Sequence, residues 1–290
     1  MIFGFFLGQK KPKLSEFIAP PLIKYGIPLS IMGLLLKEGI DSDLIKTALI
    51  AFCSIGFLIV LINSSPIFKT KLPNYTLQLA GLIGNTSFLG IPIAIALLPS
   101  STINFTIGFD LGTTLFAWIL GPFFLIDKAK SNTTLNFLGF LKAILKSPAS
   151  RGIIGVFIAY LFKLENVLGD YLWIPARIVI LLAIIVVGTR LGIITKNKTK
   201  FFDLNGGMKY SIMLKLFILP LIIFIICRFL SFNLNETSAL VLQAGTPSAV
   251  STILMAEAYK INQKIAATIL FTTTLISIIT IPILTFLLNI

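Results

Sequence analysis

The sequence predicts an all-helical integral membrane protein, and three observations support this fold class. First, only 12% of the 290 residues are charged whereas 56% are hydrophobic, and the mean hydropathy is +0.98. A soluble domain carries about 25% charged residues, because its surface must be solvated. Second, the apolar residues are grouped in segments of about 20 residues, the length that crosses a bilayer. Third, the basic residues that give the chain its net charge of +13 lie between these segments and not along one stripe. This pattern favours a membrane protein over a nucleic-acid-binding one.

Nine apolar segments are expected to form transmembrane helices joined by short connections. They are 16–36, 43–64, 75–98, 104–126, 147–163, 170–191, 207–230, 236–258 and 264–288. The opening residues MIFGFFLGQKK are too few to cross a bilayer, and their lysines follow the apolar run, unlike those of a signal peptide. This stretch is expected to be the last two turns of a helix that is otherwise truncated.

The distribution of basic residues predicts the orientation of these helices. With the segment around Lys10 in the cytoplasm, 17 of the 24 Lys and Arg residues lie on the cytoplasmic side and 4 on the outer side. The other three fall within spans. We therefore expect a multi-pass protein of the cell or inner membrane, with its C-terminus outside and with loops 65–74, 127–146 and 192–206 in the cytoplasm.

Two of the spans are interrupted near their middle by small and polar residues. The interruptions are GLIGNTSFLGIP at Gly81–Pro92 and LQAGTPSAVST at Leu242–Thr252. Glycine and proline in a membrane helix often serve only packing or kinks. Two matching interruptions favour a transport site instead, because broken helices expose N–H and C=O groups that are tolerated only beside protein or a water-filled cavity.

The two interruptions indicate an internal repeat. Asn85 and Ser248 are 163 residues apart, and the same offset maps 43–64 onto 206–227, which is also a predicted span. We therefore expect two five-helix repeats that follow each other in the chain. Because five is odd, the repeats have opposite orientations in the membrane, as in many secondary transporters. The expected parts are a truncated first repeat at 1–126 (four spans and the short opening helix), a cytoplasmic linker at 127–146 and a second repeat at 147–290.

The residues around both interruptions resemble the auxin efflux carrier (AEC) family, which includes the plant PIN-type auxin carriers. GNTSFLGIPIAIAL at Gly84–Leu97 resembles the first crossover helix of the family, and ALVLQAGTPSAVSTILMAEAYKIN at Ala239–Asn262 resembles the second. GFDLGTTLFAWILGP at Gly108–Pro122 resembles the helix after the first crossover. The matching positions are Asn85, Thr86, Gly90, Ile91, Pro92, Asp110, Trp118, Gly121, Gln243, Ala244, Pro247, Ala256 and Tyr259.

The resemblance implies an NhaA/PIN-like fold, in which ten helices form an inverted five-helix repeat with a scaffold part, a transport part and two crossing broken helices. This chain then lacks most of the first of the ten helices. The resemblance also implies export or exchange of a small organic anion such as a carboxylate, a surrounding of membrane lipid, and a homodimer as one form of assembly. Gly84 stands where plant carriers have proline, and 127–146 is shorter than their central loop, so auxin itself is not implied.

Polar side chains at the two interruptions are the candidate substrate ligands. An amide in mid-span offers a donor and an acceptor, so Asn85 either binds a substrate or ion or forms an interhelical hydrogen bond. The hydroxyls of the second interruption either line the site or bond the carbonyl four residues earlier. The expected substrate ligands are Asn85, Thr86, Gln243, Thr246 and Ser248, with Ser251 and Thr252 beside them. The residues expected to set the backbone shape are Gly84, Gly90, Pro92, Gly245 and Pro247.

Charged residues within the spans form a second group of candidates. Asp110 lies well inside an apolar span, where a carboxylate costs several kcal/mol unless it is paired or protonated. It is either a proton or cation site or a wetted structural residue. Lys24, Arg177 and Lys215 are expected to extend towards the membrane surface. If one of them faces a cavity, it is the natural counter-charge for a carboxylate substrate.

These features predict a secondary carrier that works by alternating access and exports an organic anion, with H⁺ or Na⁺ as the coupling ion if one is used. The chain has no phosphate-binding glycine motif, no histidine and one embedded acid, which argues against ATP-driven transport, an intramembrane enzyme, a metal site and a cofactor. The alternative is a sodium-coupled organic-anion symporter of the bile-acid carrier type, which sodium dependence of uptake would distinguish. A channel is a further alternative, against which saturable counterflow would argue.

Overall fold

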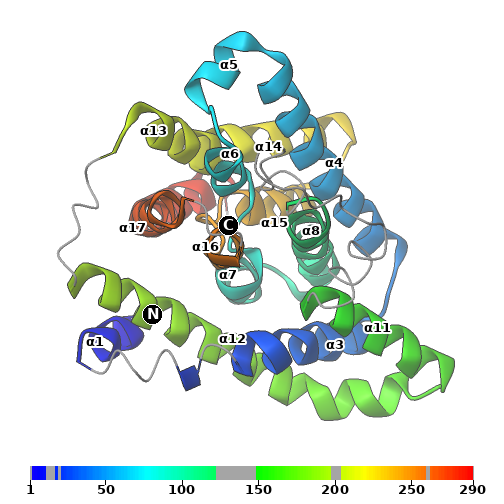
Figure 1. Ribbon diagram of the computed structural model, residues 1–290. Coiled ribbons are helices and arrows are strands. Elements are labelled where there is room, and N and C mark those ends of the chain that lie inside the picture. The colour runs from blue at the N-terminus through cyan, green and yellow to red at the C-terminus, as the bar shows by residue number, and fades with distance from the viewer. Residues whose placement is uncertain are drawn as a thin grey trace, which may run out of the picture. The chain divides into compact units, whose positions relative to one another are not determined.

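The computed structural model describes residues 2–10, 17–18, 21–121, 148–196, 204–258 and 262–289. Its elements are helices and helical turns, and no strand occurs among these residues (Figure 1). The predicted all-helical class is therefore confirmed for this part of the chain. The linker 127–146, most of the loop 192–206 and Tyr259 lie outside the described residues.

The helices form two compact units, and each unit takes segments from both halves of the chain. The first unit comprises 1–41 and 138–200, and the second comprises 42–137 and 201–290. The units therefore cut across the two predicted sequence repeats, since each repeat contributes its opening helices to the first unit and the rest to the second.

The first unit is held together by close helix packing. Its elements are α1 (Ile2–Lys10), the π-helical turn η1 (Leu22–Gly26), α3 (Ile27–Glu38), α11 (Pro148–Leu161) and α12 (Glu165–Lys196). A Cβ atom on Gly33 would lie 2.6 Å from the carbonyl oxygen of Leu172, and one on Gly4 would overlap the carbonyl oxygen of Ile185. Small residues of this kind let membrane helices approach closely. The opening helix α1 is packed in this way against α12.

The second unit contains the remaining helices. They are α4 (Ser42–Ser64), α5 (Pro66–Lys71), α6 (Tyr75–Leu82), η2 (Thr86–Gly90), α7 (Ile91–Leu97), η3 (Ser100–Thr102), α8 (Ile103–Leu115), η4 (Phe116–Leu120), α13 (Gly206–Met213), η5 (Leu214–Ile218), α14 (Leu219–Phe229), α15 (Leu234–Ala244), α16 (Val250–Ala258) and α17 (Gln263–Leu287). Within the described ranges, three continuous helical stretches are long and apolar enough to cross a membrane by themselves: Ser42–Ser64, Gly206–Phe229 and Gln263–Leu287. The chain is therefore an integral membrane protein.

Four π-helical turns precede prolines. The turns η1, η2, η4 and η5 end two residues before Pro28, Pro92, Pro122 and Pro220, respectively. A proline in a helix lacks an N–H donor and its ring collides with the carbonyl four residues earlier. A wider π turn gives that carbonyl room, and such turns are frequent at functional sites. Three of the four lie in the second unit, and two of these, η2 and η5, carry residues of the candidate site.

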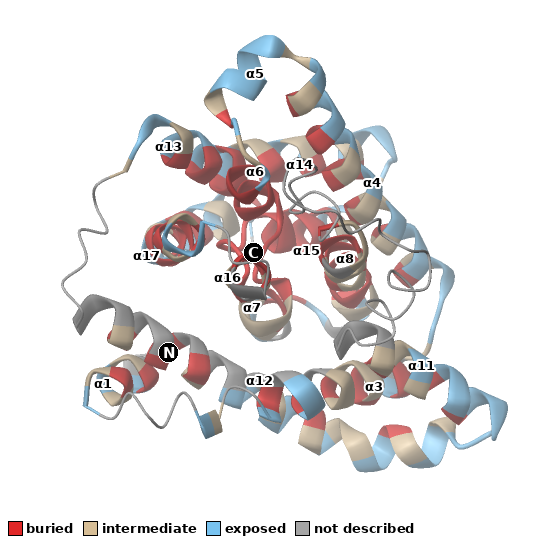
Figure 2. Ribbon diagram, viewed as in Figure 1, coloured by how far each residue is buried: buried red, intermediate tan, exposed pale blue. Residues whose placement is uncertain are grey.

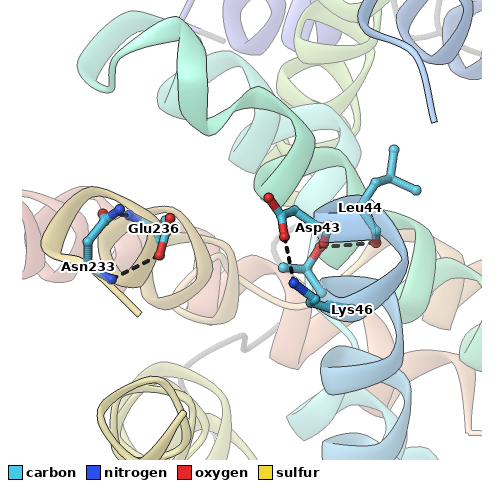
Figure 3. A network of polar contacts seen from close by, with 6 residues as sticks. Asp43, Leu44, Lys46, Asn233 and Glu236 are labelled. Carbon is cyan, nitrogen blue, oxygen red and sulfur yellow. Dashed lines mark hydrogen bonds and ion pairs between the residues drawn. The ribbon is translucent and has the colours of Figure 1, made fainter. Parts of the chain in front are cut away.

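Two helices at the centre of the second unit, α6 and α15, are buried on every side over most of their length (Figure 2). Both begin with a side-chain cap. All residues of α6 after Tyr75 are buried, as are those of α15 from Thr237 onwards. At the start of α15, Asn233 Oδ1 accepts from Glu236 N–H at 3.0 Å, and Glu236 Oε2 accepts from Asn233 N–H at 2.9 Å. This reciprocal cap is drawn in Figure 3, together with the ion pair of Asp43 and Lys46 at the start of α4.

Candidate functional site at the two helix interruptions

Both helices predicted to be interrupted do end in the middle of their segments, and the two breaks contact each other. The first break follows α6 and the second follows α15. The Asn85 N–H donates to the Pro247 carbonyl at 2.7 Å, and the Ala249 N–H donates to the Ile83 carbonyl at 2.9 Å. These two bonds form one antiparallel bridge between Gly84 and Ser248, and the contact between the two breaks around this bridge is called the crossing below. Backbone groups that the broken helices leave free are thus paired across the crossing, as a membrane interior requires.

Two glycines of the first break make room for side chains of the second helix. A Cβ atom on Gly84 would lie 2.5 Å from Thr246 Oγ1 and 2.9 Å from Lys215 Nζ. A Cβ atom on Gly90 would overlap Gln243 Oε1. Glycine at position 84 is therefore explained by the close approach of polar side chains, which a proline ring there would obstruct.

Lys215 lies at this crossing, and the expectation that it extends towards the membrane surface is wrong. Its side chain is 1% exposed, and its Nζ donates at 2.5 Å to the carbonyl of Ala244, the last residue of α15. The residue is nine positions into the Gly206–Phe229 helix, about 14 Å along its axis, so the membrane surface is distant. Among the described residues no carboxylate lies within 4 Å of its ammonium group.

The other two cations within the predicted spans differ from Lys215 in their exposure. Both Lys24 and Arg177 are exposed and belong to the first unit. The Lys24 ammonium lies 4.9 Å from the ring centre of Tyr25, and the Arg177 guanidinium lies 4.3 Å from that of Trp173. Cations over aromatic faces at exposed positions are stabilised without burial of their charge.

Asp110 on α8 is buried against the start of η2. Its side chain is 4% exposed, and its Oδ1 atom accepts hydrogen bonds from Thr86 Oγ1 at 2.5 Å and from Ser87 Oγ at 2.6 Å. The carboxyl group therefore connects α8 to the residues that follow Asn85. Bonds of this kind to a carboxylate are stronger than neutral ones. The interpretation of Asp110 as merely wetted structure is not supported, because two hydroxyls hold it in the interior.

Two amide side chains at the crossing have unused hydrogen-bonding groups. Asn85 is 3% exposed and its Nδ2 atom makes no hydrogen bond within the described residues. Gln243 is fully buried, and neither Nε2 nor Oε1 makes one within the same part of the chain. A buried polar group without a partner costs about 1–3 kcal/mol. These amides are thus available to a ligand at the crossing.

The candidate hydroxyls, by contrast, are engaged with the backbone. Thr246 Oγ1 donates to the Gln243 carbonyl at 2.7 Å, and Thr252 Oγ1 donates to the Ala249 carbonyl at 2.7 Å. Ser248 Oγ donates to the Ala80 carbonyl on α6 at 2.5 Å. These side chains brace the crossing, and each oxygen retains the capacity to accept a further hydrogen bond. Ser251 is half-buried.

Sequence reasoning did not select two polar residues that the structure brings to the crossing. Ser87 donates to Asp110, and Thr273 Oγ1 on α17 accepts from the Ser248 N–H at 3.1 Å. Ser87 directly follows the Asn-Thr pair, and Thr273 is the middle of three consecutive threonines in the last span, so both had a visible signal. Within the described residues no three His, Cys, Asp or Glu side chains are grouped as metal ligands would be.

The part of the chain that forms the crossing is similar to known proteins. A family model described as a membrane transport protein matches residues 23–285. A protein of Methanocaldococcus jannaschii, described as an uncharacterized transporter, is 24% identical over 297 residues, which cover 97% of this chain and 93% of that protein. The matched range includes both interruptions, Asp110 and Lys215.

Proposed function

Because the chain belongs to the membrane transport protein family, the auxin efflux carrier family that its interruptions resemble, we propose that it is a secondary carrier for a small organic anion. The proposed substrate class is a carboxylate, the proposed mechanism is alternating access, and the proposed direction is export. The two broken helices form the substrate site, since groups at a crossing in mid-membrane can be reached from either side in turn.

The observation that carries the proposal is the buried cation at the crossing. Lys215 is 1% exposed and is bonded to the Ala244 carbonyl, with no carboxylate in reach among the described residues. A buried charge is expensive unless it is paired and hydrogen-bonded. An anionic substrate supplies that pair. The free Nδ2 atom of Asn85 and the free Nε2 atom of Gln243 supply N–H donors that fit carboxylate oxygens.

The proposed membrane architecture is the inverted five-helix repeat with nine spans. It is supported by the break in α6–α7, by the break in α15–α16 and by the antiparallel pairing of their backbones. The division into two units, each drawn from both repeats, supports a scaffold part and a transport part, with both breaks in the second unit. The proposed orientation has the C-terminus outside and loop 65–74 in the cytoplasm.

Asp110 is the proposed site for a coupling H⁺ or Na⁺. Its carboxyl group is buried and accepts hydrogen bonds from two hydroxyls, and a proton or cation could bind to the same carboxyl group. The alternative is a sodium-coupled organic-anion symporter of the bile-acid carrier type. Uptake into proteoliposomes that increases with a Na⁺ gradient, and does not respond to a pH gradient, would favour that alternative.

A thermal-shift screen of the purified chain against C3–C6 carboxylates, with and without Na⁺ and at two pH values, tests the proposal. We expect at least one carboxylate to raise the melting temperature, and Asn85→Ala to abolish this increase while the unliganded melting temperature stays within about 2 °C, roughly 1 kcal/mol. An undiminished increase in the variant removes Asn85 from the site. No increase with any carboxylate, combined with no saturable counterflow, contradicts the proposed substrate class.

A further inference from the structure

A surface at one end of the second unit combines exposed apolar and basic side chains and has no part in the transport site. α5 is a six-residue helix between α4 and α6, and none of its residues is buried. Ile67 is 65% exposed and Phe68 is 45% exposed, and Lys69 beside them is exposed as well. Exposed apolar residues next to lysines are unusual in water but typical of helices at a membrane surface.

The start of α13 packs against α5 and adds a further lysine to this surface. The Lys71 ammonium lies 4.7 Å from the ring centre of Tyr210, and a Cβ atom on Gly207 would lie 3.3 Å from the Lys71 carbonyl oxygen. Lys209 precedes Tyr210 and is exposed. Figure 2 shows α5 and the first turn of α13 as exposed stretches. Residues far apart in the sequence thus form one basic surface, part of which the Tyr210 ring holds in place.

The position of this surface corresponds to the boundary between lipid and water. One residue separates Pro66 from the membrane-crossing stretch Ser42–Ser64, and Lys209 lies in the first turn of the stretch Gly206–Phe229. The last turn of the first stretch and the first turn of the second therefore lie at the same membrane boundary, next to α5. In the proposed orientation this boundary is the cytoplasmic one.

The chemistry of the surface selects one kind of partner. Residues 65–75 and 204–213 contain three lysines and no acidic residue. Lysines beside a membrane attract anionic headgroups, while exposed apolar side chains enter the acyl boundary. A free phosphate would bind the lysines but leave Ile67 and Phe68 in water. An anionic phospholipid satisfies both kinds of side chain.

We propose that the surface formed by Ile67, Phe68, Lys69, Lys71 and Lys209, the α5 surface, binds the headgroup of an anionic phospholipid. The lipid phosphate lies between the lysines, and its acyl chains contact the two apolar residues. A bound lipid would hold α5 against the start of the stretch Gly206–Phe229, which carries Lys215. This inference goes beyond the proposed function and does not depend on the transported substrate.

Lipid titration of the full chain in an uncharged detergent, read by native mass spectrometry, tests the proposal. The probes are a phosphatidylglycerol and a phosphatidylcholine with the same acyl chains. The test variant is Lys69→Gln with Lys209→Gln. The control is Lys46→Gln with Arg228→Gln, which removes two exposed basic side chains at the far end of α4, the helix before α5, and at the far end of the stretch Gly206–Phe229. Each lysine near an anionic surface contributes roughly fivefold in affinity.

We expect the wild type to prefer phosphatidylglycerol, the test variant to lose about tenfold or more of that affinity, and the control to stay within about twofold. Ile67→Ser with Phe68→Ser should weaken both lipids. Equal losses in test and control variants, or no preference between the lipids, would overturn the proposal. So would inorganic phosphate that displaces the lipid at equal concentration, because the surface would then be a phosphate site and not a lipid site.

Discussion

The two helix interruptions meet in one antiparallel bridge, but their helix ends contact side chains of opposite charge. At the first, Asp110 accepts from the hydroxyls of Thr86 and Ser87, where η2 begins. At the second, Lys215 donates to the carbonyl of Ala244, where α15 ends. A helix start carries partial positive charge and a helix end partial negative charge, so each side chain is opposite in sign to the helix end it contacts. The chain thus compensates both helix ends, and the ammonium group of Lys215, which also lies next to Gly84, is close to both breaks.

The breaks also divide their polar side chains between two tasks. Thr246 and Ser248 satisfy backbone carbonyls and hold the crossing, whereas Asn85 and Gln243 have amide groups without a partner in the described chain. Substitution of the hydroxyl residues should therefore lower the stability of the protein, whereas substitution of the amide residues should weaken ligand binding. The variants below test this difference.

The largest effect is expected from Lys215→Met, which removes the cation and keeps most of the side-chain length. The dissociation constant of the carboxylate that gives the largest thermal shift should rise by about 100-fold or more, because loss of one partner of a buried ion pair costs about 3 kcal/mol or more. A thermal-shift titration measures this, with Lys24→Met as the matched control. Unchanged affinity in the Lys215 variant would mean that the cation does not bind the substrate.

The next effect is expected from Gln243→Leu. A hydrogen bond to a charged group contributes about 1.5 kcal/mol or more, so the same dissociation constant should rise about tenfold or more. The melting temperature without ligand should stay the same or rise, because the amide has no partner in the described chain. Ser248→Ala is the opposite case: loss of the bond to Ala80 should lower the melting temperature by about 2 °C or more. A Gln243 variant that unfolds easily and binds normally would contradict this division.

A smaller effect on affinity is expected from Asp110→Asn, which removes the charge of the first break and keeps an acceptor. Since the proposed carboxylate ligands are Lys215, Asn85 and Gln243 and not Asp110, the dissociation constant should change by less than about threefold, under roughly 1 kcal/mol. Accumulation driven by a H⁺ or Na⁺ gradient should be lost while counterflow persists. Proteoliposome assays of both processes separate the two roles. Gradient-driven accumulation that survives in the variant would exclude Asp110 as the coupling site.

The smallest effect is expected from Arg177→Gln in the first unit. An exposed cation over an aromatic ring contributes about 0.5–1 kcal/mol, so the melting temperature should fall by no more than about 2 °C. Carboxylate affinity should be unchanged. If the Arg177 variant lost as much carboxylate affinity as the Lys215 variant, the position of Lys215 at the breaks would not explain its effect on binding.

Much of the fold could be predicted from residue patterns. Runs of about 20 apolar residues predicted where α4 and α17 lie, because a membrane helix must be apolar over its whole length. The glycine and proline clusters predicted both interruptions, since glycine destabilises a helix and proline removes one of its N–H donors. The resemblance to the auxin efflux carrier family is confirmed by the family match over residues 23–285.

The side-chain environment of the site was harder to predict. Lys215 and Lys24 are both lysines inside apolar segments, and the sequence does not show which of them faces the crossing. Both lie in π turns, Lys24 in η1 and Lys215 in η5, so their difference depends on which side of its helix each lysine occupies. The two compact units could not be predicted from the sequence either, because they are defined by contacts between helices that lie far apart in the chain. The assignment of substrate ligands, the inverted repeat and the coupling ion remain predictions.

A crystal structure with an α-bromo derivative of the stabilising carboxylate tests the central claim most directly. Bromine scatters anomalously, so its position is found independently of any assumption about the site. We predict a single strong peak at the crossing, with the carboxylate on the Lys215 ammonium and beside the Asn85 and Gln243 amides. A peak away from both breaks, in crystals where Lys215 still binds only the Ala244 carbonyl, would contradict the claim that the crossing is the anion site.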